Sequence, residues 1–253
     1  MTDGEFRVDP HVKMVDERVV ARAKRRGLDA LVYAPHFTRL PDIRAQARRF
    51  SDEELLVVPA REVFTGSFHE RKHVLALGLS EPVPDFISLE AAMAEFDRQD
   101  AAVLAPHPEF ATVSLEPEDL ADYRGTVDAI EIYNPKHLPR HNRRAGELAR
   151  DTGLPPFGSS YAHLRGTVGE VWTAFEEPCW SEAALATALR EGTPRRVYHR
   201  DGPTHAGRCV AETGHLLYEN TWEKIDRLFL QGTEPTHPRH IAYEGRFDDA
   251  AVY

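Results

Sequence analysis

The chain has 253 residues, of which 42% are hydrophobic and 28% charged, the profile of an ordinary globular protein. Its formal net charge of −10 argues against a general nucleic-acid binder. No run of about 18 apolar residues is present and the first residues lack the basic and apolar regions of a signal peptide, so a cytoplasmic location is expected. The two cysteines, Cys179 and Cys209, have no CxxC spacing, which argues against a disulfide framework or a cysteine-rich zinc site.

Short apolar runs alternate with amphipathic segments along most of the chain. Strands are expected at 6–8, 29–35, 54–60, 73–79, 101–106, 127–134, 155–160 and 170–175, and helices at 17–27, 41–50, 88–99, 139–153 and 181–192. Ser88 is placed to cap the third helix, and glycines end the first, fourth and fifth. The alternation predicts an α/β fold with parallel strands, and its repetition favours a barrel.

The pattern weakens from Thr193 onward. The remaining segment is polar, carries five histidines without metal-ligand spacing and shows few clear strands. We therefore expect a barrel over residues 1–192 and an extension over 193–253 that wraps on it.

Side chains able to bind a metal cluster at the ends of the predicted strands. Five of them follow apolar runs and one begins a run: His11, His36, Glu62, His107 and His163 follow, and His73 begins. Because the carboxyl ends of parallel barrel strands meet at one rim, these residues should converge. A single histidine in such a place is more often structural, but imidazoles and a carboxylate together are a ligand set for zinc, iron or manganese.

Five segments in order carry a resemblance to a known family. They are "GLDALVYAPHFT", "VVPAREVFTGSFHERKHVLALGL", "AVLAPHPEF", "VDAIEIYN" and "GSSYAHLRGTVGEVWTAF". With them the chain resembles the PHP (polymerase and histidinol phosphatase) family of metal-dependent phosphoesterases from residue 5 to residue 192. The resemblance implies a distorted, TIM-like (β/α)7 barrel, and the later residues resemble a PHP-associated C-terminal extension.

The resemblance implies a metal-ligand set with gaps. The matching ligands are His11, His36, Glu62, His73, His107 and His163, and the departures are Lys13, Pro35 and Tyr161. One family metal position would keep His11 and Glu62 but lose two ligands to Lys13 and Tyr161. Glu62, His73 and His107 form a complete triad, and His36 and His163 keep part of a third position, so one or two divalent ions are expected rather than three.

The replaced ligands suggest a catalytic role for Lys13 and Tyr161. A lysine ammonium in "VDPHVKM" would stand where a metal charge is lost, and a phenol at 161 would donate a hydrogen bond, which together suit a phosphate. The alternatives are that Lys13 is a surface residue beyond the strand end and that Tyr161 packs against the tail. Arg61 and Arg165 are further candidates for phosphate contact, on charge and position.

Two functions follow from these residues. The first is a metal-dependent phosphoesterase that hydrolyses a small phosphorylated substrate with a metal-activated water. The second is a non-catalytic PHP-derived protein that binds a phosphorylated ligand or a partner. The fold does not identify the substrate, because the family acts on sugar phosphates, nucleotides and DNA ends. No membrane partner is expected, and the net charge disfavours a nucleic-acid partner without ruling one out.

Overall fold

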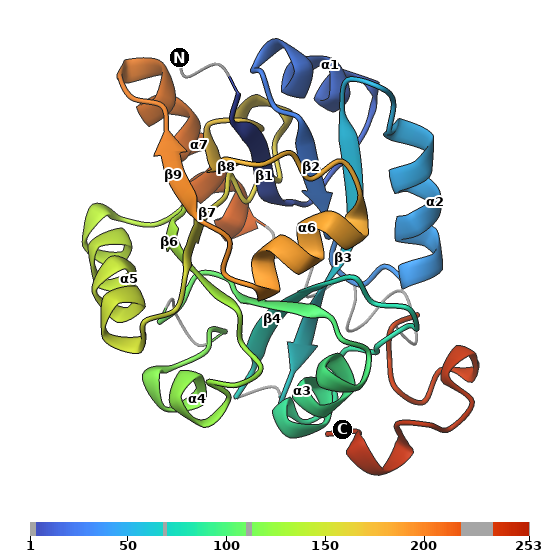
Figure 1. The fold of residues 1–253 in the computed structure, drawn as a ribbon. Helices are drawn as coiled ribbons and strands as arrows, with labels where there is room; N and C mark the ends of the chain where they lie inside the picture. The colour runs from blue at the N-terminus through green and yellow to red at the C-terminus, as the bar shows by residue number, and fades with distance from the viewer. Residues whose placement is uncertain (1–3, 68–69, 110–112, 219–234, 253) are drawn as a thin grey trace.

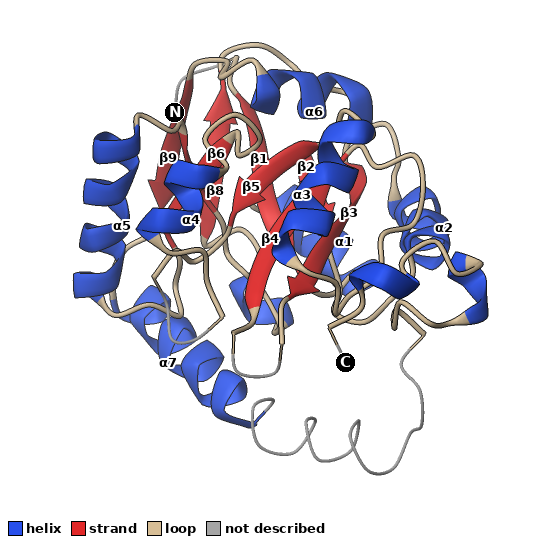
Figure 2. Ribbon diagram, turned by 90° about the horizontal axis from the view of Figure 1, so that it is seen from below, coloured by secondary structure: helices blue, strands red, loops and turns tan. Residues whose placement is uncertain are grey.

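The computed structural model describes residues 4–67, 70–109, 113–218 and 235–252, and it shows an α/β barrel (Figures 1 and 2). The strands are β1 (Phe6–Val12), β2 (Ala30–Tyr33), β3 (Leu56–Thr65), β4 (Lys72–Leu77), β5 (Ala102–Ala105), β6 (Ala129–Tyr133), β7 (Pro156–Gly158), β8 (Val171–Phe175) and β9 (Arg195–His199). They form one sheet in the order β7-β6-β5-β4-β3-β2-β1-β8-β9, which curls into a nearly closed barrel. The predicted fold class is therefore confirmed.

Helices surround this sheet. They are α1 (Glu17–Arg25), α2 (Leu40–Phe50), α3 (Leu89–Arg98), α4 (Pro117–Asp122), α5 (Pro139–Thr152), α6 (Glu182–Arg190) and α7 (Pro203–Tyr218), with short 3-10 turns η1 (Arg165–Thr167), η3 (Ile241–Tyr243) and η4 (Asp248–Ala250). The Ser88 side chain caps α3 as predicted, and Gly153 ends α5 in the left-handed conformation with φ of 66°. Of the helices described, none is long and apolar enough to cross a membrane.

The strands are not all parallel, contrary to the expectation from the alternating pattern. Strand β4 runs antiparallel to β3 and β5, and β8 runs antiparallel to β1 and β9. The reversal of β4 explains why His73 begins its strand while the other candidates follow theirs, because His73 pairs with Phe64 near the carboxyl end of β3. The region after 192 also contributes β9 and α7, which its weak sequence pattern does not indicate.

Strand register decides which side chains enter the barrel. On β3, Val58, Ala60 and Glu62 share the inward face, because side chains two apart point the same way. Strand β1 changes phase: its pairing with β2 slips by one residue between Asp9 and Val12, as in a β-bulge. Phe6 and Val8 pack in the barrel interior, whereas Val12 joins the cluster outside it.

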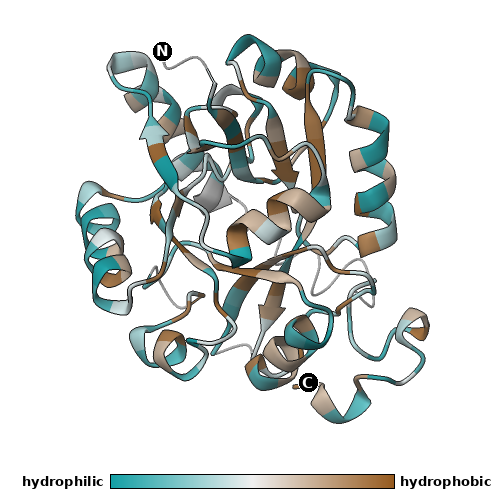
Figure 3. Ribbon diagram, in the orientation of Figure 1, coloured by the Kyte–Doolittle hydropathy of each residue, from teal (hydrophilic) through white to brown (hydrophobic). Residues whose placement is uncertain are grey.

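Helix α6 closes the barrel end opposite the candidate site. Leu185 and Leu189 of α6 pack in one buried cluster with Phe6 at the start of β1, Phe175 at the end of β8 and Leu77 at the end of the reversed β4. Figure 1 shows α6 lying across the barrel, and Figure 3 shows that the strands beneath it are mostly apolar. The candidate polar residues lie toward the opposite end, where Glu62 and His107 follow the inward-facing apolar residues of their strands.

A close backbone approach at Gly158 joins the two ends of the sheet. The Thr173 hydroxyl of β8 donates to the carbonyl oxygen of Gly158 in β7 and accepts from its N–H, both at 3.0 Å. A Cβ at Gly158 would lie 2.4 Å from Val197 Cγ1 and 3.1 Å from Val171 Cγ1. The seam therefore requires a residue without a side chain.

We expect Gly158→Ala to lower the free energy of unfolding by about 1–3 kcal/mol, because overpacking forces apart strands that cannot yield freely. Gly146→Ala is the matched control, because its Cβ would meet no atom within 4 Å in the middle of α5, and it should raise stability by about 0.5–1 kcal/mol. Urea unfolding of both variants measures the difference. Equal effects of the two substitutions would contradict the steric role of Gly158.

Candidate metal and anion site

The Glu62 carboxylate is the centre of the site. It is fully buried at the carboxyl end of β3 and has imidazole nitrogens on both oxygens. The Nε2 atoms of His107 and His11 lie 3.1 Å and 3.7 Å from Oε1, and His73 Nδ1 lies 3.6 Å from it. His36 Nε2 lies 2.7 Å from Oε2. The structure thus brings four predicted histidines around one carboxylate, and their role as ligands stays a prediction.

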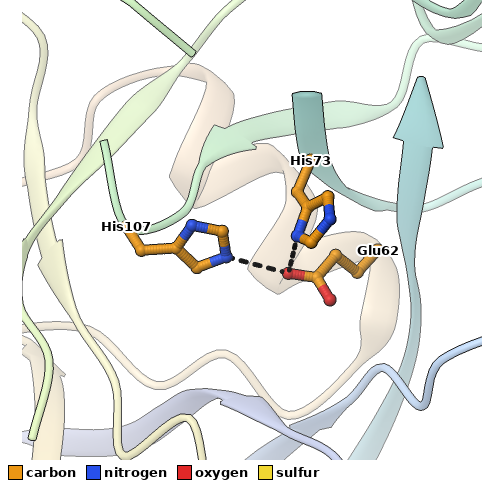
Figure 4. Close-up of side chains that lie close together, drawn as sticks. All are labelled: Glu62, His73 and His107. Atoms are coloured by element: carbon orange, nitrogen blue, oxygen red, sulfur yellow. Dashed lines mark hydrogen bonds and ion pairs between the residues drawn. The ribbon is translucent and has the colours of Figure 1, made fainter. Parts of the chain in front are cut away.

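Glu62, His73 and His107 form the group best suited to hold a metal (Figure 4). Each is buried, and one ligand atom from each lies within 4.8 Å of the other two. Two imidazoles and a carboxylate match the donor set of catalytic zinc sites, which keep a fourth position open. The buried nitrogens of His11 make no hydrogen bond within the described residues, so they are chemically available as well. The donor set therefore fits a divalent ion.

The protonation states also suit a metal. Burial and the Lys13 ammonium lower the pKa of His11, and the same two causes lower the pKa of His36 to about 3. Burial opposes ionisation of Glu62, but Lys13 and the surrounding histidines overcome it and hold the Glu62 pKa well below its usual range. Neutral imidazoles around an ionised carboxylate are the forms that coordinate a cation.

Lys13 lies inside the site. Its side chain is 5% exposed, so the alternative of a surface residue is wrong. The Nζ atom donates to Glu62 Oε2 at 2.5 Å and to the carbonyl oxygen of Ala34 at 2.7 Å, beside Pro35, which offers no ligand atom. The β1 bulge brings His11 and Lys13 to this end of the barrel. The ammonium therefore contacts the oxygen of Glu62 that faces away from His73 and His107.

Tyr161 is enclosed by the same groups. Its side chain is buried, and its ring centroid lies 4.7 Å from that of His11, 5.2 Å from that of His107 and 4.8 Å from that of His163. The backbone has φ of 43°, an unusual conformation for a bulky residue. Residues held in such conformations concentrate at functional sites.

A second buried lysine was not foreseen from the sequence. Lys136 Nζ lies 2.5 Å from His163 Nδ1, 3.6 Å from Glu212 Oε2 and 4.2 Å from the Tyr161 ring centroid. Glu212 comes from α7, and it also accepts from the backbone N–H groups of His163 and Leu164. The signal that could have found Lys136 is its place just after the predicted strand 127–134, the same position that the candidate histidines occupy.

His163 and His36 lie together, with ring centroids 5.5 Å apart. Burial and the Lys136 ammonium lower the pKa of His163 well below its usual range. Lys13 thus contacts Glu62, and Lys136 contacts His163. The two lysines are 5.3 Å and 4.2 Å from the Tyr161 ring centroid, so a bound anion would meet two positive charges beside this phenol.

Glu131 holds the backbone of His107 in place. Its Oε2 accepts from the backbone N–H of His107 at 2.7 Å and from the Asn134 amide, and its Oε1 accepts from the Ser159 hydroxyl. His107 itself has φ of 34°. These bonds hold the left-handed turn that aims the imidazole at Glu62.

The two arginines proposed for phosphate contact form ion pairs with carboxylates of this chain. Arg61 is fully buried on the outward face of β3, where it pairs with Asp85 at 3.0 Å and donates to the carbonyl oxygen of Thr38. Arg165 pairs at 2.7 Å with Asp16, whose carboxylate caps α1. Strand alternation explains why Arg61 points away from the site: Arg61 is next to the inward-facing Glu62, and neighbours of an inward residue point outward.

Comparisons with known proteins agree with this architecture. The family model "PHP-associated" matches residues 139–194. PsfC from Pseudomonas syringae PB-5123 superposes with a TM-score of 0.63 at 18% identity, covering 86% of this chain and 100% of that one. A two-domain protein from Bacteroides vulgatus containing a predicted PHP-like metal-dependent phosphoesterase has a TM-score of 0.58 at 19% identity, covering 83% and 71%.

The lesion-specific endonuclease PfuEndoQ from Pyrococcus furiosus has a TM-score of 0.54 at 14% identity, covering 76% of this chain and 57% of that one. No curated protein matches the chain in sequence. The family-model match and the shared fold support the assignment to the PHP family that the sequence segments indicate, and the barrel is PHP-like.

We expect Asp85→Asn to lower the free energy of unfolding by about 3–5 kcal/mol, because it leaves the Arg61 charge buried without its partner. Asp42→Asn is the control, because Asp42 pairs with Arg39 at the surface, with side chains 58% and 36% exposed, and it should cost about 0–1 kcal/mol. Chemical unfolding measures both, and bound metal should not change. If Asp85→Asn lost bound metal while its stability stayed unchanged, the ion pair of Arg61 would instead have a role at the metal site.

We expect the double variant Lys13→His with Tyr161→Asp to bind additional zinc. The new side chains would join His11 and Glu62 to give four ligands, the usual count for zinc. Lys13→His alone should gain less, because Tyr161 still fills the space beside His11. Metal stoichiometry of the purified variants is the measurement, and a double variant that binds no more metal than the parent would show that these positions share no common site.

Proposed function

We propose that this protein is a divalent-metal-dependent phosphoesterase that hydrolyses a small phosphorylated substrate, with zinc, manganese or iron as its cofactor. The observation that carries the proposal is the buried triad of Glu62, His73 and His107 at the open end of a PHP-like barrel. A divalent ion bound there supplies a Lewis acid for the phosphoryl oxygen and lowers the pKa of a coordinated water to about 7.

The two oxygens of Glu62 divide the site between a metal and an ammonium. Oε1 faces His11, His73 and His107, whereas Oε2 is held by Lys13 at 2.5 Å and His36 at 2.7 Å. A second ion on Oε2 would have to displace the Lys13 ammonium or share this oxygen with it. The arrangement therefore favours a single ion, held by the residues around Oε1.

The lysines would serve the substrate rather than the metal. The side chains of Lys13 and Lys136 are both buried, and their Nζ atoms lie 5.3 Å and 4.2 Å from the Tyr161 ring centroid, where each supplies one positive charge. A lysine binds phosphate as a point charge with three donors. Their task in the proposed reaction is to orient the phosphate and balance its charge as the ester bond breaks.

The second candidate function is a non-catalytic PHP-derived protein that binds a phosphorylated ligand. The contact of Lys13 with Glu62 favours it, because an ammonium beside the central carboxylate competes with a cation for the same negative charge. Bound metal separates the candidates: the phosphoesterase requires an ion, and the binding protein requires only the two lysines.

We expect the purified protein to contain about one equivalent of transition metal, and Glu62→Gln to lose most of it with at least a hundredfold loss of turnover, of the order that a catalytic group contributes. Metal analysis is combined with a panel of sugar phosphates, nucleotides and DNA 3′-phosphates. Glu95→Gln is the control, because this carboxylate binds Arg98 and Arg246 instead. Unchanged metal in Glu62→Gln would remove the assignment, and phosphate binding without metal or turnover would favour the second function.

A further inference from the structure

A cysteine, a histidine and a glutamate lie in hydrogen-bonded series beside helix α7. Cys209 Sγ is 3.3 Å from His205 Nε2, and His205 Nδ1 is 3.0 Å from Glu170 Oε2. His205 and Cys209 are one turn apart on α7, whereas Glu170 precedes β8, so the tertiary fold supplies the third member. A thiol, a base and a carboxylate that orients the base form the arrangement that activates a nucleophile.

The carboxylate fixes the tautomer of His205. A carboxylate only accepts, so the proton of the neutral imidazole lies on Nδ1 and points to Glu170. Nε2 is then the acceptor that faces the Cys209 thiol. The Tyr133 hydroxyl also lies 3.3 Å from Nε2. The Tyr133 ring stacks on His199 with centroids 4.2 Å apart, and the His199 ring centroid lies 6.2 Å from that of His205.

Glu170 is itself held firmly. Its Oε1 accepts from Arg22, Arg26 and Arg208 at 3.1, 2.9 and 2.5 Å, which leaves Oε2 for His205. The carboxylate is 1% exposed. Three guanidinium groups and one imidazole therefore fix the position of this carboxylate.

The resting thiol is neutral. Burial and the Glu170 carboxylate raise the pKa of Cys209, so a preformed thiolate is not favoured. Nucleophilic attack by this sulfur therefore needs a base that takes the proton as the new bond forms, and His205 is in hydrogen-bond reach. Cys209 is partly exposed, whereas Cys179 is buried and its Sγ faces the carbonyl oxygen of Glu177.

We propose that Cys209 is a nucleophilic modification site that takes small electrophiles, with His205 as its base and Glu170 as a positioning residue. In the reaction with an alkyl halide, the sulfur forms a bond to carbon, the carbon–halogen bond breaks and halide leaves. The thiol proton passes to His205 Nε2. The site is separate from the metal centre and does not depend on the proposed phosphoesterase activity.

Iodoacetamide alkylation of the full chain tests the site, with both cysteines followed by peptide mass spectrometry. We expect Cys209 to react while Cys179 stays protected, and His205→Asn to slow Cys209 by about tenfold to a hundredfold. His240→Asn is the matched control, because His240 caps η3 through a bond to the Ala242 N–H that asparagine can also make, and it should leave the rate unchanged. Cys179 reports folding, because its labelling in any variant would reveal an opened structure.

The pH dependence of the wild-type rate gives a measurement that needs no variant. A rate carried by a neighbouring base should level off below the pH at which the thiol itself ionises, whereas the rate of an unassisted thiol keeps rising past about pH 8.5. Cys209 labelling that is as slow as that of Cys179, that is unchanged in folded His205→Asn, or that rises steadily to pH 9 would overturn the proposal.

Discussion

The negative charge of Glu62 is the constraint on which the site depends. An ionised carboxylate without exposure to water is very costly unless opposite charge and hydrogen bonds surround it. Here Lys13 supplies the charge and the histidines supply polar contacts, and burial keeps those histidines neutral. Removing the lysine leaves a strong cation site, and adding a metal places two cations on one carboxylate. Lys13 contacts Oε2, whereas His73 and His107 lie beside Oε1. The ammonium and a metal can therefore share the carboxylate without sharing an oxygen.

The barrel geometry creates that arrangement from three irregularities. The bulge in β1 changes the phase of its alternation before His11 and Lys13. The reversal of β4 brings the beginning of a strand, with His73, to the rim where the other strands end. Helix α6 fills the opposite end with leucines, so the interior below the site is apolar. The first two features position residues of the site, and the third closes the other end of the barrel.

Helix α7 connects the site with the rest of the molecule. Through Glu212 it holds the backbone of His163 and pairs with Lys136, and two turns earlier it carries His205 beside Glu170. The helix thus contributes a buried anion to the cation-rich centre and a buried base to a separate thiol. The region after residue 192 therefore contacts the candidate site directly.

The sequence by itself determined the fold class and the six candidate ligands, because apolar periodicity and the chemistry at strand ends are local properties. It also located the three departures from the ligand set that the family resemblance implies, at Lys13, Pro35 and Tyr161. Tertiary structure alone decided which oxygen of Glu62 meets Lys13, that Arg61 points outward to Asp85, and that Lys136, Glu212 and the Cys209 series exist as clusters. These relations join residues far apart in the chain, and they depend on a one-residue register shift, on strand direction and on the docking of α7, none of which has a local sequence signal.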